Sequence, residues 1–358
     1  VRWSPDGRFG AYERGSGLDR VTHVWDLTGS GPREVAAVSG FGAVFSPTGG
    51  QLAYLTVEPT PEFTEARERL ARESAGADRA TRTRIRGEMA ALEAEHTRVA
   101  FLDLASGEER KLPGSGMAVS SLFFGPDGVT YLVGGPMDGP NGPGVYRLGP
   151  NGSASPLLEG TVASDPFFTP SGEFLVYGTG RGSFSVLQVP TGEIHEFQGS
   201  APVLSADGEV LAYLSVTESG SGLTVMPMGS VPEATTFDRP SPVSTSSSRS
   251  CSSCPTQSGL AIAPDGSFAV VQARPREDWE LFRVSLRGGS ETGTVTQITR
   301  EIQHDLYPTV LADGRLLAMK GEGRHRRSHL YDLEAGEKTW LFRNNTVRTV
   351  APEYEWAP

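Results

Sequence analysis

The sequence is poor in cysteine, in histidine and in basic residues relative to acidic ones. Its 358 residues include 2 cysteines and 6 histidines, and 32 Lys and Arg stand against 43 Asp and Glu, for a net charge of -11. Proteins that bind nucleic acid neutralise phosphates with clustered Lys and Arg in excess. We therefore expect no nucleic-acid partner.

Long apolar runs are also absent. No stretch approaches the roughly 18 to 20 apolar residues that a membrane-spanning helix needs, and no charged-then-apolar signal segment precedes Val1. We expect a chain without a membrane span, from which any export signal has been removed or left out.

The two cysteines stand close together as Cys251-Ser-Ser-Cys254 in a stretch rich in Ser, Thr and Pro. A zinc site needs about four Cys or His ligands, and no second pair occurs at finger spacing. A redox motif belongs at a helix start after a strand, which these flanks do not provide. The sequence favours a small loop-closing disulfide in an exported protein over either alternative.

Glycine and proline are plentiful, with 44 and 26 residues, and they mark many tight turns between short strands. The turns belong to a repeat with an apolar residue, a small residue, usually Pro, and then Gly before alternating apolar residues. The copies are Trp3–Gly7, Phe45–Gly49, Phe124–Gly128, Phe168–Gly172, Leu204–Gly208, Ile262–Gly266 and Leu311–Gly314. Each copy predicts a β-hairpin with a two-residue turn.

Most copies are followed by a third strand, such as 24–29, 99–107 or 330–336, and by a short fourth strand, such as 34–38. Four strands in a period of about 40 to 45 residues are typical of a propeller blade. The sequence therefore predicts an all-β fold, a seven-bladed or eight-bladed β-propeller of four-stranded antiparallel blades, with residues 1–358 as a single domain.

Two insertions interrupt the repeat. Residues 60–96 carry the helical pattern, with Thr60 as the cap before Pro61 and a second cap at Asp78, and they predict a helical hairpin in blade two. Residues 239–257 form the Ser/Thr-rich loop that holds the cysteines. The balanced charges of the hairpin fit a solvated face, or else a charged docking surface.

The two ends of the sequence cut the same point of the repeat, because Glu355–Pro358 matches Arg2–Pro5. Three explanations fit: the chain is a piece of a longer protein, the mature protein is processed, or the terminal strand closes the ring or pairs with another molecule. They leave seven versus eight blades open.

One basic cluster could make a contact, and its residues are Arg324, His325, Arg326, Arg327 and His329. The two histidines share a face if this segment is a strand, but the adjacent arginines disfavour a metal ion. Two interpretations remain for this cluster: a polar hairpin tip, or a loop that binds an anion or a partner. Gly134–Gly144 lacks the Lys and the strand-to-helix setting of a phosphate loop, so we expect a long hairpin turn.

The repeated Trp/Phe-Ser-Pro-Asp-Gly hairpins resemble the propellers shared by the TolB translocation protein, tricorn protease and the prolyl oligopeptidase family. Phe45–Leu55, the charged insertion and Val99–Glu108 are similar to the N-terminal propeller of secreted bacterial members of the last family. The resemblance implies a propeller that caps a separate α/β-hydrolase domain and filters access to its serine nucleophile.

The chain departs from that family because it has no Gly-x-Ser-x-Gly nucleophile elbow. We therefore expect no catalytic residue, cofactor or metal within it. The interpretation we favour is a non-catalytic module of an exported hydrolase of the prolyl oligopeptidase type, which binds, gates or scaffolds. The alternative is a stand-alone binding or assembly protein of the cell envelope or surface. Its partner would be a protein or peptide, such as a hydrolase domain or further copies of itself.

Overall fold

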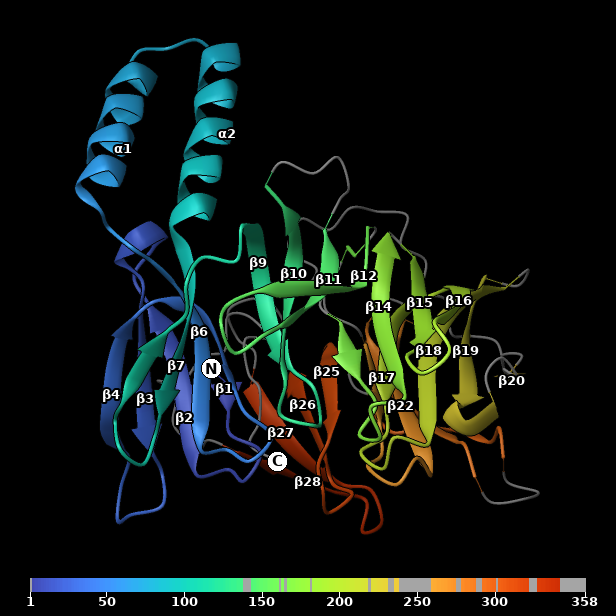
Figure 1. Ribbon diagram of the computed structural model, residues 1–358. Coiled ribbons are helices and arrows are strands. Elements are labelled where there is room, and N and C mark those ends of the chain that lie inside the picture. Colours follow the sequence, from blue (N-terminus) through green and yellow to red (C-terminus); the bar gives the residue numbers. More distant parts are fainter. Residues whose placement is uncertain are drawn as a thin grey trace. The chain divides into compact units, whose positions relative to one another are not determined.

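The computed structural model describes residues 2–137, 143–160, 162–163, 166–180, 182–217, 220–230, 235–237, 259–274, 278–287, 292–300, 302–321 and 327–341. The chain divides into two compact units, a first that holds residues up to Phe167 and a second that begins at Phe168. Strands dominate both units (Figure 1).

The first unit contains three four-stranded sheets. Their strands are β1 (Arg2–Trp3), β2 (Phe9–Arg14), β3 (Val21–Asp26) and β4 (Arg33–Ser39); β5 (Phe41–Phe45), β6 (Gln51–Val57), β7 (Thr97–Asp103) and β8 (Glu109–Lys111); and β9 (Met117–Phe124), β10 (Thr130–Pro136), β11 (Gly144–Leu148) and β12 (Ala154–Leu158). A short 3-10 helix, Gly17–Asp19, precedes β3.

The second unit contains four more sheets, the first of which starts at the boundary. Their strands are β13 (Phe167–Phe168), β14 (Phe174–Gly180), β15 (Ser183–Gln188) and β16 (Glu193–Gln198); β17 (Ser200–Leu204), β18 (Val210–Thr217), β19 (Gly220–Pro227) and β20 (Thr235–Phe237); β21 (Leu260–Ile262), β22 (Phe268–Ala273), β23 (Glu280–Ser285) and β24 (Val295–Gln297); and β25 (Asp305–Val310), β26 (Leu316–Lys320), β27 (Arg327–Asp332) and β28 (Glu337–Trp340). A 3-10 turn, Met228–Ser230, follows β19.

Each sheet consists of four strands that are consecutive in the sequence and pair in sequence order, and the described pairs are antiparallel. The described residues therefore form seven four-stranded sheets. This confirms the predicted all-β fold, a seven-bladed propeller of four-stranded antiparallel blades. An eighth blade would need strands beyond Leu341, which lie outside the described residues.

The second sheet buries both of its faces, because successive side chains along its strands point alternately to the two neighbouring sheets. On β6, Leu52 and Tyr54 pack in a core with Phe9 and Val24 of the first sheet. Ala53 and Leu55 point the other way, into a core shared with the third sheet. All four of these β6 side chains are fully buried, and burial of a large apolar side chain stabilises a fold by about 1.5–3 kcal/mol.

Five of the seven repeated hairpin turns share one geometry, seen in the first sheet. Ser4 N donates to Phe9 O at 2.9 Å and Gly7 N donates to Ser4 O at 2.8 Å. Phe9 N donates to the Ser4 hydroxyl oxygen at 2.8 Å. The prediction of a two-residue turn is therefore wrong: the loop has four residues here, because the Pro-Asp pair makes a turn of its own before the glycine. The turns after β9 and β25 have three-residue loops, in which Gly125 N donates to Val129 O and Leu311 N to Arg315 O, both at 2.8 Å.

The segment between β6 and β7 contains two helices, α1 (Pro61–Ser74) and α2 (Arg79–His96), which stand beyond the ends of those strands (Figure 1). The Thr60 hydroxyl accepts from Phe63 N at 3.2 Å and the Asp78 carboxylate from Thr81 N at 2.8 Å, so both helices are capped. Glu58 N donates to His96 O at 2.9 Å, which extends the β6–β7 ladder to the base of the hairpin. Neither helix has the length and apolarity to cross a bilayer, within the described part of the chain.

Candidate functional site

The hairpin turns of three consecutive sheets in the second unit surround a pocket of about 600 Å³. The sheets are β13–β16, β17–β20 and β21–β24. Apolar side chains that include Phe174, Val225 and Leu286 line part of it, and carboxylates of Glu173, Asp207 and Glu209 line the rest together with the guanidinium of Arg287. The pocket therefore combines an apolar wall with fixed charges of both signs.

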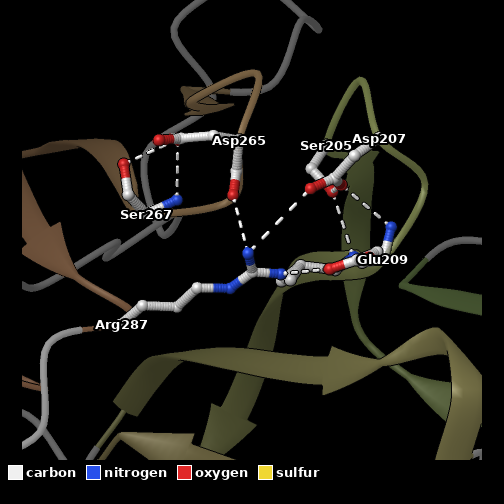
Figure 2. A network of polar contacts seen from close by, with 7 residues as sticks. Ser205, Asp207, Glu209, Asp265, Ser267 and Arg287 are labelled. Carbon is white, nitrogen blue, oxygen red and sulfur yellow. Dashed lines mark hydrogen bonds and ion pairs between the residues drawn. The ribbon is translucent and has the colours of Figure 1, made fainter.

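Arg287 crosses between two of these sheets. It follows β23, and its guanidinium reaches the turn of the preceding sheet (Figure 2). Its Nη1 donates to the backbone oxygen of Asp265 at 3.0 Å and its Nη2 to Glu209 Oε2 at 3.0 Å, while Asp207 Oδ2 lies 3.9 Å from Nη1. One side chain thus joins the loops after β17 and β21.

The turn that receives Arg287 is held by its own hydrogen bonds. The Ser205 hydroxyl donates to Asp207 Oδ1 at 2.5 Å, and Glu209 N donates to the same oxygen at 3.0 Å. These bonds, with the charge of Arg287, lower the pKa of Asp207 below its usual range. The Ser267 hydroxyl and N–H do the same for the pKa of Asp265. Both carboxylates stay ionised near neutral pH, so they supply fixed charge and are poor proton acceptors.

Backbone contacts lock the turns against each other. Ala206 N donates to Pro264 O at 2.9 Å. A Cβ on Gly208 would lie 2.6 Å from the Pro170 ring of the preceding turn, and one on Gly266 would lie 2.9 Å from Val210. The wall of the pocket is therefore preformed rather than assembled around a ligand.

The basic cluster proposed from the sequence is described in part. Arg327 begins β27, and His329, two residues on, is 3% exposed. His329 Nδ1 lies 3.0 Å from Arg327 O, and the imidazole ring packs edge-on against Trp340. Burial lowers the pKa of His329. His329 is thus an interior side chain. Arg324, His325 and Arg326 lie outside the described residues, so a contact at the loop stays a prediction.

The cysteine loop also lies outside the described residues, so the pairing of Cys251 with Cys254 stays a prediction. Within the described part of the chain, no group of three or more His, Cys, Asp or Glu side chains is arranged to hold a metal ion.

Sequence reasoning missed Arg287, although a signal was present. The third strands of three other sheets end at an Asp that is followed by Leu, namely Asp26, Asp103 and Asp332, and each Asp bonds to its own turn. The corresponding position before Leu286 is Ser285, and Arg287 follows. This blade lacks the Asp that would bond to its own turn, and the side chain of Arg287 contacts the neighbouring blade instead.

We expect Arg287→Met to lower the free energy of unfolding by about 1–2 kcal/mol, because it removes charge-assisted bonds between two sheets and keeps the apolar stem. Arg315→Met is the matched control: its side chain is 47% exposed against 46% for Arg287, but it pairs with Asp313 within one turn. We expect the control to cost much less, because an exposed ion pair within one turn contributes little to stability. Urea unfolding measures both, and equal losses would show that Arg287 does not couple the sheets.

No family model and no curated protein matches the sequence. Solved structures do match. Dihydro-heme d1 dehydrogenase NirN gives a TM-score of 0.57 at 14% identity over 94% of this chain, which spans 64% of the NirN chain and so less than two thirds of it. Oligogalacturonate lyase in complex with manganese gives 0.54 at 13% identity, over 92% of this chain and 87% of that chain.

The β-propeller domain of the Trilobed protease from Pyrococcus furiosus gives a TM-score of 0.50 at 13% identity, over 95% of this chain and 96% of that domain. Identities this low show the fold alone, and proteins of one fold carry many functions. The predicted likeness to propellers of the TolB and prolyl oligopeptidase type is therefore confirmed at the level of the fold: the chain is a β-propeller similar to one that a protease carries.

Proposed function

We propose that the chain is the non-catalytic propeller module of an exported hydrolase of the prolyl oligopeptidase type. In this role it binds a protein or peptide segment and controls access to a catalytic domain outside this sequence. The likeness of nearly the whole chain to the propeller domain of a protease supports the module. The Ser-Pro-Asp-Gly hairpins, which resemble those of secreted members of that family, support export.

The observation that carries the binding role is the pocket beside Arg287. Its polar groups are already held in defined positions by the turns, and the lowered pKa of Asp207 keeps its charge constant across neutral pH. Preformed charges beside an apolar wall suit recognition of a chain segment, since little ordering is needed on binding.

A second candidate, a stand-alone binding or assembly protein, is supported by a different feature. The helical hairpin of α1 and α2 stands away from the sheets and carries charged side chains on its exposed faces. Such a projecting hairpin could contact another protein whether or not a catalytic domain is attached to the propeller.

The intact mass of the protein purified from its source tests the two candidates. A covalent module predicts a mass well above 38.2 kDa and labelling by a fluorophosphonate probe, which reacts with activated serines. The 358-residue chain alone, produced separately, is the control and should remain unlabelled. A native mass near 38.2 kDa without labelling would overturn the module and leave the second candidate. Alkylation with and without reduction, on the same sample, reports whether Cys251 and Cys254 are joined.

A further inference from the structure

The charges of α2 are sorted along the helix. Gly87 lies at its centre, with every Arg of the helix before it and every Glu after it: Arg79, Arg82, Arg84 and Arg86, then Glu88, Glu93 and Glu95. The helix macrodipole favours the opposite order, with acids near the N-terminus and bases near the C-terminus. The order therefore destabilises an isolated α2, and its explanation has to come from a neighbour.

The neighbouring helix α1 supplies only part of the missing charge. It runs antiparallel to α2 in the hairpin (Figure 1), so its acidic first half, with Glu62 and Glu65, lies at the level of the glutamates of α2. Its second half brings Arg69 and Arg72, balanced by Glu68 and Glu73, to the level of the arginines, and Glu68 is taken up by Arg72 within α1. Among the described ion pairs, Glu73 with Arg84 is the one that joins the two helices. The hairpin is left with an acidic base and a basic outer half.

Three arginines at the outer half share one helix face, since Arg79, Arg82 and Arg86 are spaced i, i+3 and i+7. All three are exposed, and the described structure gives none of them a carboxylate partner. Arg82 bonds through Nε to the backbone oxygen of Ala77 at 2.8 Å. On a chain of net charge -11, this is a free basic stripe.

Gly87 is a second anomaly of the same helix. Glycine in a helix interior is disfavoured because it loses more conformational freedom than alanine does. A Cβ at Gly87 would meet nothing within 4 Å, so no contact inside the chain excludes a side chain. Most residues at helical spacing around Gly87 are also small, with Arg84 as the exception: Ala80, Thr83, Ala90, Ala91 and the half-buried Ala94.

We propose that α2 packs antiparallel against α2 of a second copy of this chain, with the two helices crossing at Gly87. At about 1.5 Å per residue, Arg79 lies roughly 12 Å before Gly87 and Glu93 roughly 9 Å after it. Antiparallel packing therefore places the arginine half of each helix beside the glutamate half of the other. The contact is reciprocal, as a twofold dimer requires. Small residues at the crossing let two helix backbones approach closely.

The exposed face of α2 favours a protein partner over a membrane. A helix that lies on a bilayer buries large apolar side chains such as Trp, Phe or Leu. On α2, Ile85 is 1% exposed and faces the interior of the hairpin, which leaves arginine and small residues outside.

Sedimentation velocity of the 358-residue chain at about 50 mM and 500 mM salt tests the proposal, because screening weakens exposed charge pairs. We expect a dimer at low salt that dissociates at high salt. Arg79→Glu/Arg82→Glu/Arg86→Glu should weaken dimerisation at least about tenfold. This variant should keep its helix, since acids in the first turns suit the macrodipole, and circular dichroism checks that.

A charge-exchange experiment makes the test specific. Glu88→Arg/Glu93→Arg/Glu95→Arg should be monomeric alone, as should the arginine variant, and an equal mixture of the two should form a heterodimer. Gly87→Gln, which raises helix propensity but fills the crossing, should also weaken the dimer. A wild-type chain that stays monomeric at low salt, or a mixture that does not associate, would overturn the proposal. Neither result bears on the hydrolase module, which the mass and the probe decide.

Discussion

Gly208→Ala should lower the free energy of unfolding by about 3 kcal/mol, whereas Gly192→Ala should cost about 1 kcal/mol. The two glycines have nearly the same backbone, with φ of +76° and +75°, so both substitutions strain the chain equally. They differ in what surrounds them. A Cβ at Gly208 would lie 2.6 Å from Cδ of Pro170, and a Cβ at Gly192 would meet nothing within 4 Å.

The pair separates backbone strain from packing between sheets. Pro170 belongs to the turn after β13 and its ring cannot rotate away, so the turns must move apart to admit a methyl group. Urea unfolding of both variants gives the difference. If Gly208→Ala costs no more than Gly192→Ala, the turns do not interlock, and the wall of the Arg287 pocket is not preformed.

The turns show how far local sequence determines this fold. Each copy of the repeat, with a Pro or Ala and then a small polar residue before Gly, forms a hairpin, because the hydrogen bonds of its turn are made within four or five residues. Where the turn has an Asp before its Gly, that Asp accepts from the N–H two residues on, at 3.0 Å in Asp207, Asp265 and Asp313 alike. Counting such turns predicted seven blades or eight, and the described residues form seven four-stranded sheets.

The sequence was less informative about turn length and about contacts between blades. Pro5 and Asp6 were compatible with a tighter turn, and the hydroxyl of Ser4, which replaces a ladder bond, is not visible in a pattern of apolar residues. Arg287 and Glu209 are 78 residues apart in the sequence. Their contact depends on which blades are neighbours and on how two loops face each other, which residue spacing does not specify.

A buried acid between the last two sheets illustrates the same limit. Asp305, at the start of β25, is fully buried, and its Oδ1 accepts from the Tyr331 hydroxyl at 2.7 Å. Its Oδ2 is buried without a hydrogen-bond partner in the described structure. The charge of Glu280 acts on Asp305, and Glu280 Oε2 accepts a hydrogen bond from the Thr299 hydroxyl at 2.5 Å. Nothing in the local sequence distinguishes Asp305 from the exposed turn acids.

Burial raises the pKa of Asp305 to about 6, with the charge of Glu280 adding to the rise and the Tyr331 hydrogen bond opposing it. Between pH 4 and 6 the folded chain therefore binds a proton that the unfolded chain has released. The stability that this group contributes is fully present below pH 4 and is lost as the pH rises through 6.

Asp305→Asn should remove this dependence, because the amide oxygen still accepts from Tyr331 and the side chain carries no charge. We expect the variant to be about as stable as the wild type at pH 4.5 and more stable by about 1–2 kcal/mol at pH 7.5. The full shift corresponds to about 3 kcal/mol, which residual solvent screening reduces. Urea unfolding across this range gives the difference curve.

Asp313→Asn is the control with the opposite sign. The hydrogen bonds from Arg315 lower the pKa of the exposed Asp313. The wild type should therefore be more stable than Asp313→Asn above about pH 4, and this difference in stability should disappear as the pH falls further. Between pH 4.5 and 7.5 the Asp313 difference should be flat while the Asp305 difference rises. A flat Asp305 curve would mean that this carboxyl titrates with its ordinary pKa, and that solvent reaches it between the sheets.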